Sequence, residues 1–270
     1  MFWNKKDKRD LIILCNSWPK AGTHLLLEMA SIILRNKKEW YNEKDIKVEI
    51  EQVKDLEKHI DNRIKEYGNR FAMKGHIGYS KEVLKLFKKK NIKIFFIIRD
   101  PRDVICSTVR WVIDLRKNWE AHTFFKTLNK GDQISYVIKG LPNIEPFKNK
   151  GSCLLWDKPL KERYQNLTPW TESLDVCVLK YEDLSGNNGE RQLEISINKV
   201  LEFLKIEDKS LVKSLRTKII NKNSQTFHTG KSGGWKKEFT EKNLKEFVES
   251  GSEELVRKFN YEPTQNIIKN

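Results

Sequence analysis

A turn near the N-terminus carries the residue types that bind anions. Residues 17–24 read Ser-Trp-Pro-Lys-Ala-Gly-Thr-His, and they separate the apolar run Leu11–Cys15 from a helical pattern. Amides at a helix N-terminus lack partners and lie at the positive end of the helix dipole, so they favour an anion. Gly22 permits close backbone approach, and Lys20 adds a positive charge. This pattern predicts a cradle for an anion, although an ordinary turn with a surface lysine has the same residues.

A second group of polar residues follows the strongest strand pattern, Ile92–Ile98. Arg99 comes directly after this run, and Pro101 is suited to the first turn of a helix predicted over Val104–Leu115. Ser107 would then lie two turns into that helix. Taken alone, this arrangement is typical of a solvated helix start with local ion pairs.

The pattern of the whole chain predicts an α/β fold. Four short apolar runs have the composition of strands buried in a mainly parallel sheet: Leu11–Cys15, Phe71–Lys74, Ile92–Ile98 and Val176–Leu179. Helical spacing occurs between and after them, over residues 25–33, 81–90, 192–204 and 244–261. We expect one domain, residues 1–270, with helices flanking the sheet. The aromatic-rich stretch 116–170 fits this rhythm poorly and is predicted to be an irregular insertion or lid on the acceptor side.

Composition excludes several classes of protein. The 270 residues are 38% hydrophobic and 10% aromatic, which is too apolar for a disordered chain. No apolar run approaches the roughly 18–20 residues of a membrane span, and the N-terminal one is too short for a secretion signal, so we expect a soluble cytoplasmic protein without membrane contact. Cys15, Cys106 and Cys177 lie in apolar segments and are predicted to be reduced core thiols. No metal-ligand spacing occurs.

Four segments together resemble the PAPS-dependent sulfotransferases, in their soluble, cytosolic-type branch. Residues 17–24 resemble the loop TYPKSGTTW, and residues 98–107 (IRDPRDVICS) resemble the second motif of that family. Residues 179–184 (LKYEDL) resemble LxYEDL, and residues 228–236 (HTGKSGGWK) resemble RKGxxGxWK. The four segments follow the family's order, and the resemblance implies a sulfotransferase fold related to that of P-loop kinases.

The resemblance implies which residues bind 3′-phosphoadenosine 5′-phosphosulfate (PAPS) and its product PAP. The first loop would hold the phosphosulfate through Lys20, Ala21, Gly22, Thr23 and His24. Arg99 and Ser107 would hold the 3′-phosphate, and Tyr181 would pack near the adenine. The glycine-rich segment, with its cofactor contacts His228, Thr229, Gly230 and Lys231, would fold over the ligand.

The resemblance also implies a catalytic base. In the family a K-x-H segment after the second strand supplies it, and that position falls here on His76, two residues after Lys74. A lone histidine is more often structural, but His76 follows a strand end, where parallel α/β sheets place ligands. A neutral imidazole is suited to taking a proton from a hydroxyl. We expect sulfuryl transfer to a hydroxyl of a small-molecule acceptor, with an amine less favoured. Lys20 and Lys74 would stabilise developing charge, and no metal is expected.

Some positions depart from the family pattern. The Arg-Lys pair of the glycine-rich motif is His228-Thr229 here, and Leu25 replaces an aromatic residue after the first loop. The family's dimer motif KxxxTVxxxE has Glu241 and Lys245 in place of its Val and Glu. We therefore expect a monomer or a weak homodimer.

Two other functions compete with sulfuryl transfer. A nucleotide-dependent kinase is one, but the ATP-binding pattern GxxxxGK[ST] is missing from the first turn. A polyanion or nucleic-acid binder is the other, because the net charge is +15. The basic residues are dispersed and do not alternate with aromatic ones, so no nucleic-acid partner is expected.

Overall fold

The computed structural model describes residues 10–35, 53–117, 120–140, 158–219 and 232–264. Contacts group these residues into two compact units. The sheet unit contains residues 10–18, 22–35, 53–98 and 167–219. The helical unit contains residues 19–21, 99–117, 120–140, 158–166 and 232–264. Each unit therefore combines stretches that are far apart in the sequence.

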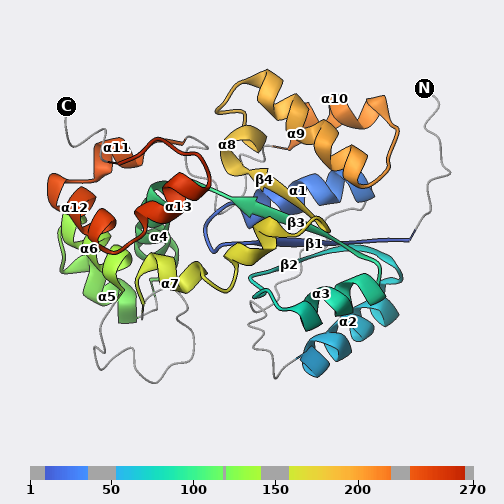
Figure 1. Ribbon diagram of the computed structural model, residues 1–270, viewed down its shortest axis with the longest axis horizontal. Helices are drawn as coiled ribbons and strands as arrows, with labels where there is room; N and C mark the ends of the chain where they lie inside the picture. Colours follow the sequence, from blue (N-terminus) through green and yellow to red (C-terminus); the bar gives the residue numbers. More distant parts are fainter. Residues whose placement is uncertain (1–9, 36–52, 118–119, 141–157, 220–231, 265–270) are drawn as a thin grey trace. The chain divides into compact units, whose positions relative to one another are not determined.

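Four parallel strands form the sheet of the sheet unit, in the order β2-β1-β3-β4 (Figure 1). They are β1 (Leu11–Ser17), β2 (Arg70–Gly75), β3 (Ile92–Ile98) and β4 (Val176–Lys180). β1 lies between β2 and β3, and every β1 residue after the first is buried. A strand covered on both faces needs a continuous apolar run, which is what the sequence has there. The predicted α/β fold with a parallel sheet is confirmed.

Helices cover both faces of this sheet (Figure 1). One face packs against α1 (Thr23–Leu34), α9 (Glu190–Phe203) and α10 (Lys209–Lys218), and the opposite face against α3 (Lys81–Lys89) with α2 (Val53–Tyr67). The short segments η4 (Thr168–Glu172) and α8 (Tyr181–Leu184) flank β4. The sheet thus has a two-sided core, and its polar chemistry is left to the strand ends.

The elements of the helical unit are α4 (Pro101–Arg110), η2 (Trp111–Leu115), α5 (Glu120–Lys126), α6 (Lys130–Lys139), α7 (Leu160–Tyr164), α11 (Trp235–Glu238), α12 (Glu241–Glu249) and α13 (Glu253–Lys258). In this unit α4 packs against α6, η2 and α11, and α12 packs against α6. The fully buried Arg102 lies 3.8 Å over the Trp235 ring and 2.7 Å from the Asp100 carboxylate. Its charge is therefore neutralised locally, as burial requires.

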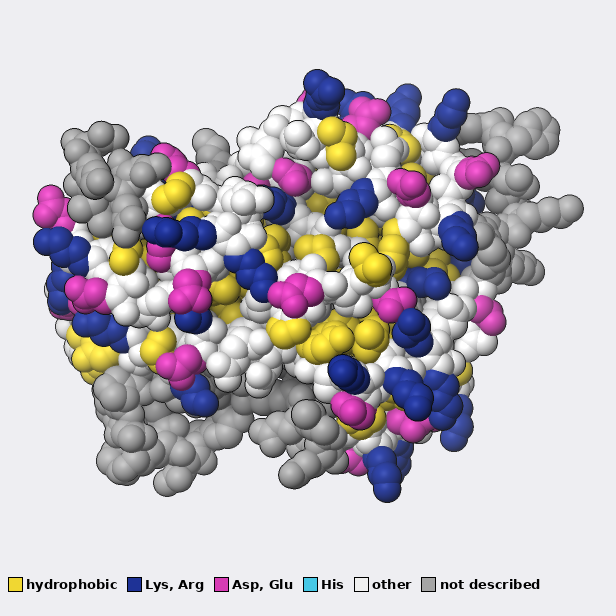
Figure 2. All heavy atoms as spheres, viewed as in Figure 1, with side chains coloured by type: hydrophobic (Ala, Val, Ile, Leu, Met, Phe, Trp, Pro, Cys, Tyr) yellow, Lys and Arg dark blue, Asp and Glu magenta, His cyan; other side chains and the backbone are white. Residues whose placement is uncertain are grey.

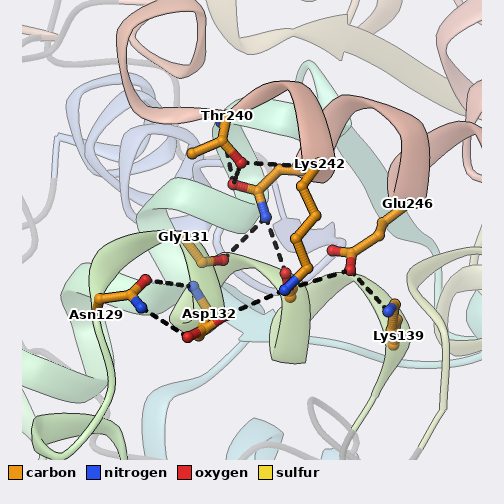
Figure 3. A network of polar contacts seen from close by, with 9 residues as sticks. Asn129, Gly131, Asp132, Lys139, Thr240, Lys242 and Glu246 are labelled. Carbon is orange, nitrogen blue, oxygen red and sulfur yellow. Dashed lines mark hydrogen bonds and ion pairs between the residues drawn. The ribbon is translucent and has the colours of Figure 1, made fainter.

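A polar network joins α6 to α12 (Figure 3). At its centre the fully buried Asn243 donates to the Gly131 carbonyl and to the Ser135 hydroxyl, each at 2.9 Å. Its side-chain oxygen accepts from the Thr240 amide at 3.1 Å and closes a capping box at the start of α12. Lys242 extends the network to Asp132 at 3.2 Å. The Asn243 carboxamide thus has partners for both its donor and its acceptor atoms.

The structure differs from the sequence predictions at the ends of elements. β1 continues through Asn16 and Ser17, whose polar side chains indicated that it ended at Cys15. Both side chains find hydrogen-bond partners inside the fold, so they tolerate burial. The single helix predicted over 244–261 is two helices, α12 and α13, separated at Gly251 with a φ of 74°.

Two further segments are more complex than their sequence patterns indicate. The helix predicted over Val104–Leu115 is α4 up to Arg110 and then a π-helix, η2. The described parts of 116–170 contain α5, α6 and α7, so they are more regular than expected. Cys15, Cys106 and Cys177 are buried and reduced, as predicted, and burial raises the pKa of Cys177 to about 11.

Replacing Asn243 by alanine should destabilise the protein. The substitution leaves buried groups on α6 and at the start of α12 without partners, and each such group costs about 1–3 kcal/mol. We expect a loss of about 2–3 kcal/mol in the free energy of unfolding, measured by urea denaturation. The exposed Lys245→Ala on the same helix serves as the control and should have little effect. Equal stability of the two variants would contradict a structural role for this network.

Candidate functional site

The carboxyl ends of the four parallel strands lie at one edge of the sheet. The candidate residues lie at these strand ends or directly after them in the sequence. Ser17 ends β1, His76 follows β2 directly, and Tyr181 follows β4 directly. Arg99 follows β3 directly as well. In open parallel sheets ligands bind at this edge, since loops and helix N-termini converge there.

The predicted cradle is the turn that leads into α1. Gly22 is the N-cap of this helix and has a φ of 118°, which side-chain-bearing residues rarely adopt. A Cβ atom on Gly22 would lie 2.7 Å from the ring of Tyr181, so the residue must be glycine for the ring to pack there. The first turn of α1 contains no acidic residue, which leaves the positive helix end available to an anion.

His76 is oriented by the end of β1. Its ring atom Nδ1 lies 2.8 Å from the Ser17 carbonyl oxygen and 3.4 Å from the Ser17 hydroxyl. A carbonyl oxygen can only accept a hydrogen bond, so Nδ1 carries the proton. In the neutral ring Nε2 is then the unprotonated atom and can accept a proton.

The same serine connects His76 to the cradle. The Ser17 hydroxyl lies 2.6 Å from the hydroxyl of Thr23, the first residue of α1, and both residues are buried. The sheet unit therefore brings His76, Ser17 and Thr23 into one chain of polar contacts, with Gly22 and Tyr181 packed together in the same unit. Lys74 lies within β2, opposite Cys15, and His24 is the second residue of α1.

Lys20 and its neighbours belong to the helical unit, where two aromatic side chains fix them. The Lys20 ammonium lies 5.2 Å from the centre of the Trp111 ring in η2. The buried Tyr164 hydroxyl donates to the Pro19 carbonyl at 3.2 Å, and burial raises the pKa of Tyr164 to about 12. Lys20 has a φ of 68°, a strained value for a residue with a side chain. Such strain is maintained where surrounding contacts hold the segment, as they do here.

Arg99 and Ser107 flank the start of α4 in the helical unit. Arg99 is buried and Ser107 is half-buried two turns into the helix. Between them, Asp103 accepts hydrogen bonds from the backbone amides of Gly233 at 2.6 Å and Trp235 at 3.2 Å. Burial raises the pKa of Asp103, and the attraction of Arg99 opposes that rise. The start of α4 is thereby tied to the end of the glycine-rich segment.

Some predicted site residues cannot be placed. His228, Thr229, Gly230 and Lys231 lie outside the described residues. Lys236, at the end of that motif, is exposed and pairs with Glu262 at 2.6 Å. Within the described parts of the chain, no group of three or more His, Cys, Asp or Glu side chains could hold a metal ion. No helix in these parts is long and apolar enough to cross a membrane.

The residues that support the predicted site could not be recognised from the sequence. Asn16, Trp111 and Tyr164 have no motif of their own, and Asp103 has the type expected of an ordinary acid in a first helical turn. Asn16 has no separate signal in the sequence, because a polar residue followed by Ser17 and Pro19 is typical of an ordinary strand end.

Comparison with known proteins identifies the family. The profile of the sulfotransferase domain matches residues 8–259, which is most of the chain. The chain belongs to the sulfotransferase family. No sequence among the curated proteins matches this sulfotransferase closely enough to count as a relative.

Solved structures agree with this fold. The crystal structure of mouse sulfotransferase SULT7A1 complexed with PAP is 20% identical, with a TM-score of 0.55 over 93% of this chain and 86% of that one. Retinol dehydratase in complex with androsterone and PAP is 16% identical, with a TM-score of 0.54 over 90% of this chain and 80% of that one. Its complex with retinol and PAP has a TM-score of 0.51 at 16% identity, over 90% and 81% of the two chains. These likenesses confirm the predicted fold.

Substituting alanine for Gly22 should destabilise the sulfotransferase by more than the positive φ of residue 22 alone would cost. The new Cβ would strain the backbone and also displace the Tyr181 ring, and overpacking of this kind costs about 1–3 kcal/mol. Gly186→Ala is the matched control, because Gly186 has a φ of 76° with open space around its Cβ position. Urea denaturation should show that Gly22→Ala loses about 1–3 kcal/mol more than Gly186→Ala. Equal losses would mean that the ring does not constrain the cradle.

The raised pKa of Asp103 predicts how this residue changes stability with pH. The folded protein holds the Asp103 proton more tightly than the unfolded chain, whose carboxyl has a pKa near 3.8. As pH rises from that value through the folded pKa, the Asp103 contribution to stability should therefore fall. The unfolding free energy of the wild-type protein minus that of Asp103→Asn should decrease over this interval. A difference that stays constant or increases would contradict the burial of this carboxyl.

Proposed function

We propose that this sulfotransferase moves the sulfuryl group of PAPS to a hydroxyl of a small-molecule acceptor and releases PAP. The observation that carries the proposal is the His76 imidazole, which is held by Ser17 beside a helix N-terminus suited to an anion. The similar solved structures were crystallised with PAP, and two of them also hold androsterone or retinol, which are small alcohols. An amine acceptor is less favoured.

The cradle fits the phosphosulfate end of PAPS. The turn brings backbone amides to the start of α1, and the lack of a Cβ on Gly22 lets the Tyr181 ring pack against the turn. In the proposal the residues from Lys20 to His24 bind the phosphosulfate, namely Lys20, Ala21, Gly22, Thr23 and His24. Tyr181 packs on the adenine. PAPS supplies an activated sulfuryl group whose leaving group is the 5′-phosphate of PAP.

Arg99 and Ser107 are the proposed ligands of the 3′-phosphate. A guanidinium binds phosphate through paired hydrogen bonds, and a hydroxyl two turns along the same helix can add a further one. His228, Thr229, Gly230 and Lys231 remain predicted contacts of the cofactor. Because Asp103 ties residues 233 and 235 to α4, it would fix the end of that segment.

The proposed reaction is an in-line displacement at sulfur. His76 Nε2 takes the proton of the acceptor hydroxyl, and the acceptor oxygen forms a bond to sulfur as the bond from sulfur to the 5′-phosphate oxygen breaks. Lys20 stabilises the negative charge that builds on this departing oxygen. Lys74 is proposed to assist. The two lysines and the N-terminus of α1 supply the positive electrostatic field that stabilises this charge, so the proposed mechanism uses no metal.

The positive charge of the chain does not favour a nucleic-acid partner. Figure 2 shows lysines and arginines spread over the visible face and interspersed with acidic side chains. Among the described residues, several lysines form exposed pairs, such as Lys88 with Asp175 at 3.0 Å and Lys161 with Glu254 at 2.6 Å. Such pairs belong to an ordinary solvated surface.

The cytoplasmic location and the monomeric or weakly dimeric state remain predictions.

Calorimetric titration with PAP tests the cofactor assignment. The wild-type protein should bind PAP selectively over ATP, ADP and AMP. Arg99→Ala should weaken PAP binding by about 10- to 100-fold, because a hydrogen bond to a charged group is worth about 1.5–3 kcal/mol.

The control is Arg191→Ala, an exposed position on α9 that removes the same charge and should leave PAP affinity unchanged. Binding of ATP with Mg²⁺ but not of PAP would replace the proposal with the kinase function. Salt-sensitive binding of random DNA at physiological ionic strength, without PAP binding, would favour the polyanion binder.

A further inference from the structure

Two consecutive residues of β1 contact two consecutive residues that follow β2. The Asn16 side chain donates to the Ile77 carbonyl at 3.0 Å and accepts from the Ile77 amide at 2.9 Å. The next residue, Ser17, accepts from His76 Nδ1 at its carbonyl oxygen, at 2.8 Å. The segment after β2 is thus held twice, once at the backbone of Ile77 and once at the ring of His76.

The Asn16 carboxamide acts as an additional peptide group of the sheet. In the register of the sheet Asn16 lies opposite Gly75, and its side chain reaches two residues further along the chain. It offers one donor and one acceptor to Ile77, as a neighbouring strand would. Asn16 is fully buried and Ile77 is 1% exposed, so water does not compete for these bonds. The pairing of β1 with this chain therefore continues beyond the end of β2.

A third hydrogen bond, from Trp170, also holds Ile77. The indole nitrogen of the buried Trp170 donates to the same Ile77 carbonyl at 2.7 Å. Ile77 is then bound at its amide and at both acceptor positions of its carbonyl. Because Ile77 is fixed, the backbone of His76 has little freedom. The His76 ring is therefore held in the orientation in which Nδ1 donates to the Ser17 carbonyl.

We propose that Asn16 is a positioning residue for His76. By holding the segment that carries His76, Asn16 fixes the proton of the ring on Nδ1 and leaves Nε2 to act as the base. Asn16 itself touches no reacting atom. The catalytic part of this inference rests on the proposed function, whereas the tautomer of His76 can be measured without substrate. Histidine that is loosely held exchanges its proton between both ring nitrogens, and only one of the two forms presents Nε2 as a base.

A purely structural role for Asn16 is the competing explanation, and the chain offers a matched control for it. Asn243 is also fully buried, with both its donor and acceptor atoms engaged, and it lies in the helical unit. Asn243→Ala should therefore cost stability without affecting the ring of His76. A difference between the two variants separates positioning from general stability.

Nitrogen-15 NMR of the histidine side chains is the first test. The His76 signals are assigned from their absence in His76→Gln. In the wild-type protein His76 should be a single tautomer, protonated on Nδ1, and Asn243→Ala should keep it. Asn16→Ala should convert these signals to those of exchanging or mixed tautomers. If Asn16→Ala does not fold, Asn16→Ser, which keeps a polar group too short to span Ile77, replaces it.

Kinetics provide the second readout. Asn16→Ala should lower kcat for sulfuryl transfer by about 10- to 100-fold, as expected when a catalytic group is misplaced, while the Kd for PAP stays unchanged. Asn243→Ala should alter neither quantity at a temperature where it is folded.

The proposal is overturned if wild-type His76 carries its proton on Nε2, or if Asn16→Ala keeps the wild-type tautomer. It is also overturned if Asn16→Ala and Asn243→Ala change kcat equally. A wild-type protein that neither binds PAP nor transfers a sulfuryl group would refute the proposed function instead, and the tautomer comparison would still decide the role of Asn16.

Discussion

The parallel pairing of β1 with β2 and β3 is the constraint from which the site follows. Because the strands run in one direction, Ser17 at the end of β1 lies beside the chain that leaves β2, and His76 can hydrogen-bond to it. The same strand end leads through the turn at Gly22 into α1. One strand therefore leads both to the support of the proposed base and to the proposed anion cradle. An antiparallel partner in the place of β2 would carry His76 to the opposite edge of the sheet.

Each unit contains buried polar side chains whose hydrogen-bond partners belong to the same unit. In the sheet unit Asn16 binds the Ile77 backbone and Ser17 binds Thr23, so burial of these side chains is compensated. In the helical unit the Asp100 carboxylate neutralises Arg102. These contacts hold the groups in fixed directions before any ligand arrives. Preorganised dipoles and charges stabilise a transition state without the cost of rearrangement, which suits a reaction whose charge builds on a departing oxygen.

The sequence predicted the strands and the turns because those features depend on local composition. Continuous apolar runs are typical of buried parallel strands, and the family motifs lie at the strand ends. The supporting contacts could not be predicted, since Asn16 and Ile77 are 61 residues apart and Asp103 and Gly233 are 130 apart. The extension of β1 through Asn16 and Ser17 was missed for the same reason: their polarity indicates a strand end unless the distant partner is known. The π-helix at Trp111 likewise has no signal in the local pattern.

Transfer of labelled sulfuryl groups from PAPS to a panel of phenols and alcohols is the most direct measurement of sulfuryl transfer by this chain. The wild-type protein should sulfate at least one acceptor class, and His76→Gln should lose about 10²- to 10⁴-fold in rate, which is the usual contribution of a general base. PAP affinity should be the same for both proteins. Unchanged transfer by His76→Gln would contradict the assigned base. A wild-type protein that binds PAP and sulfates neither phenols nor alcohols would contradict the proposed transfer to a hydroxyl.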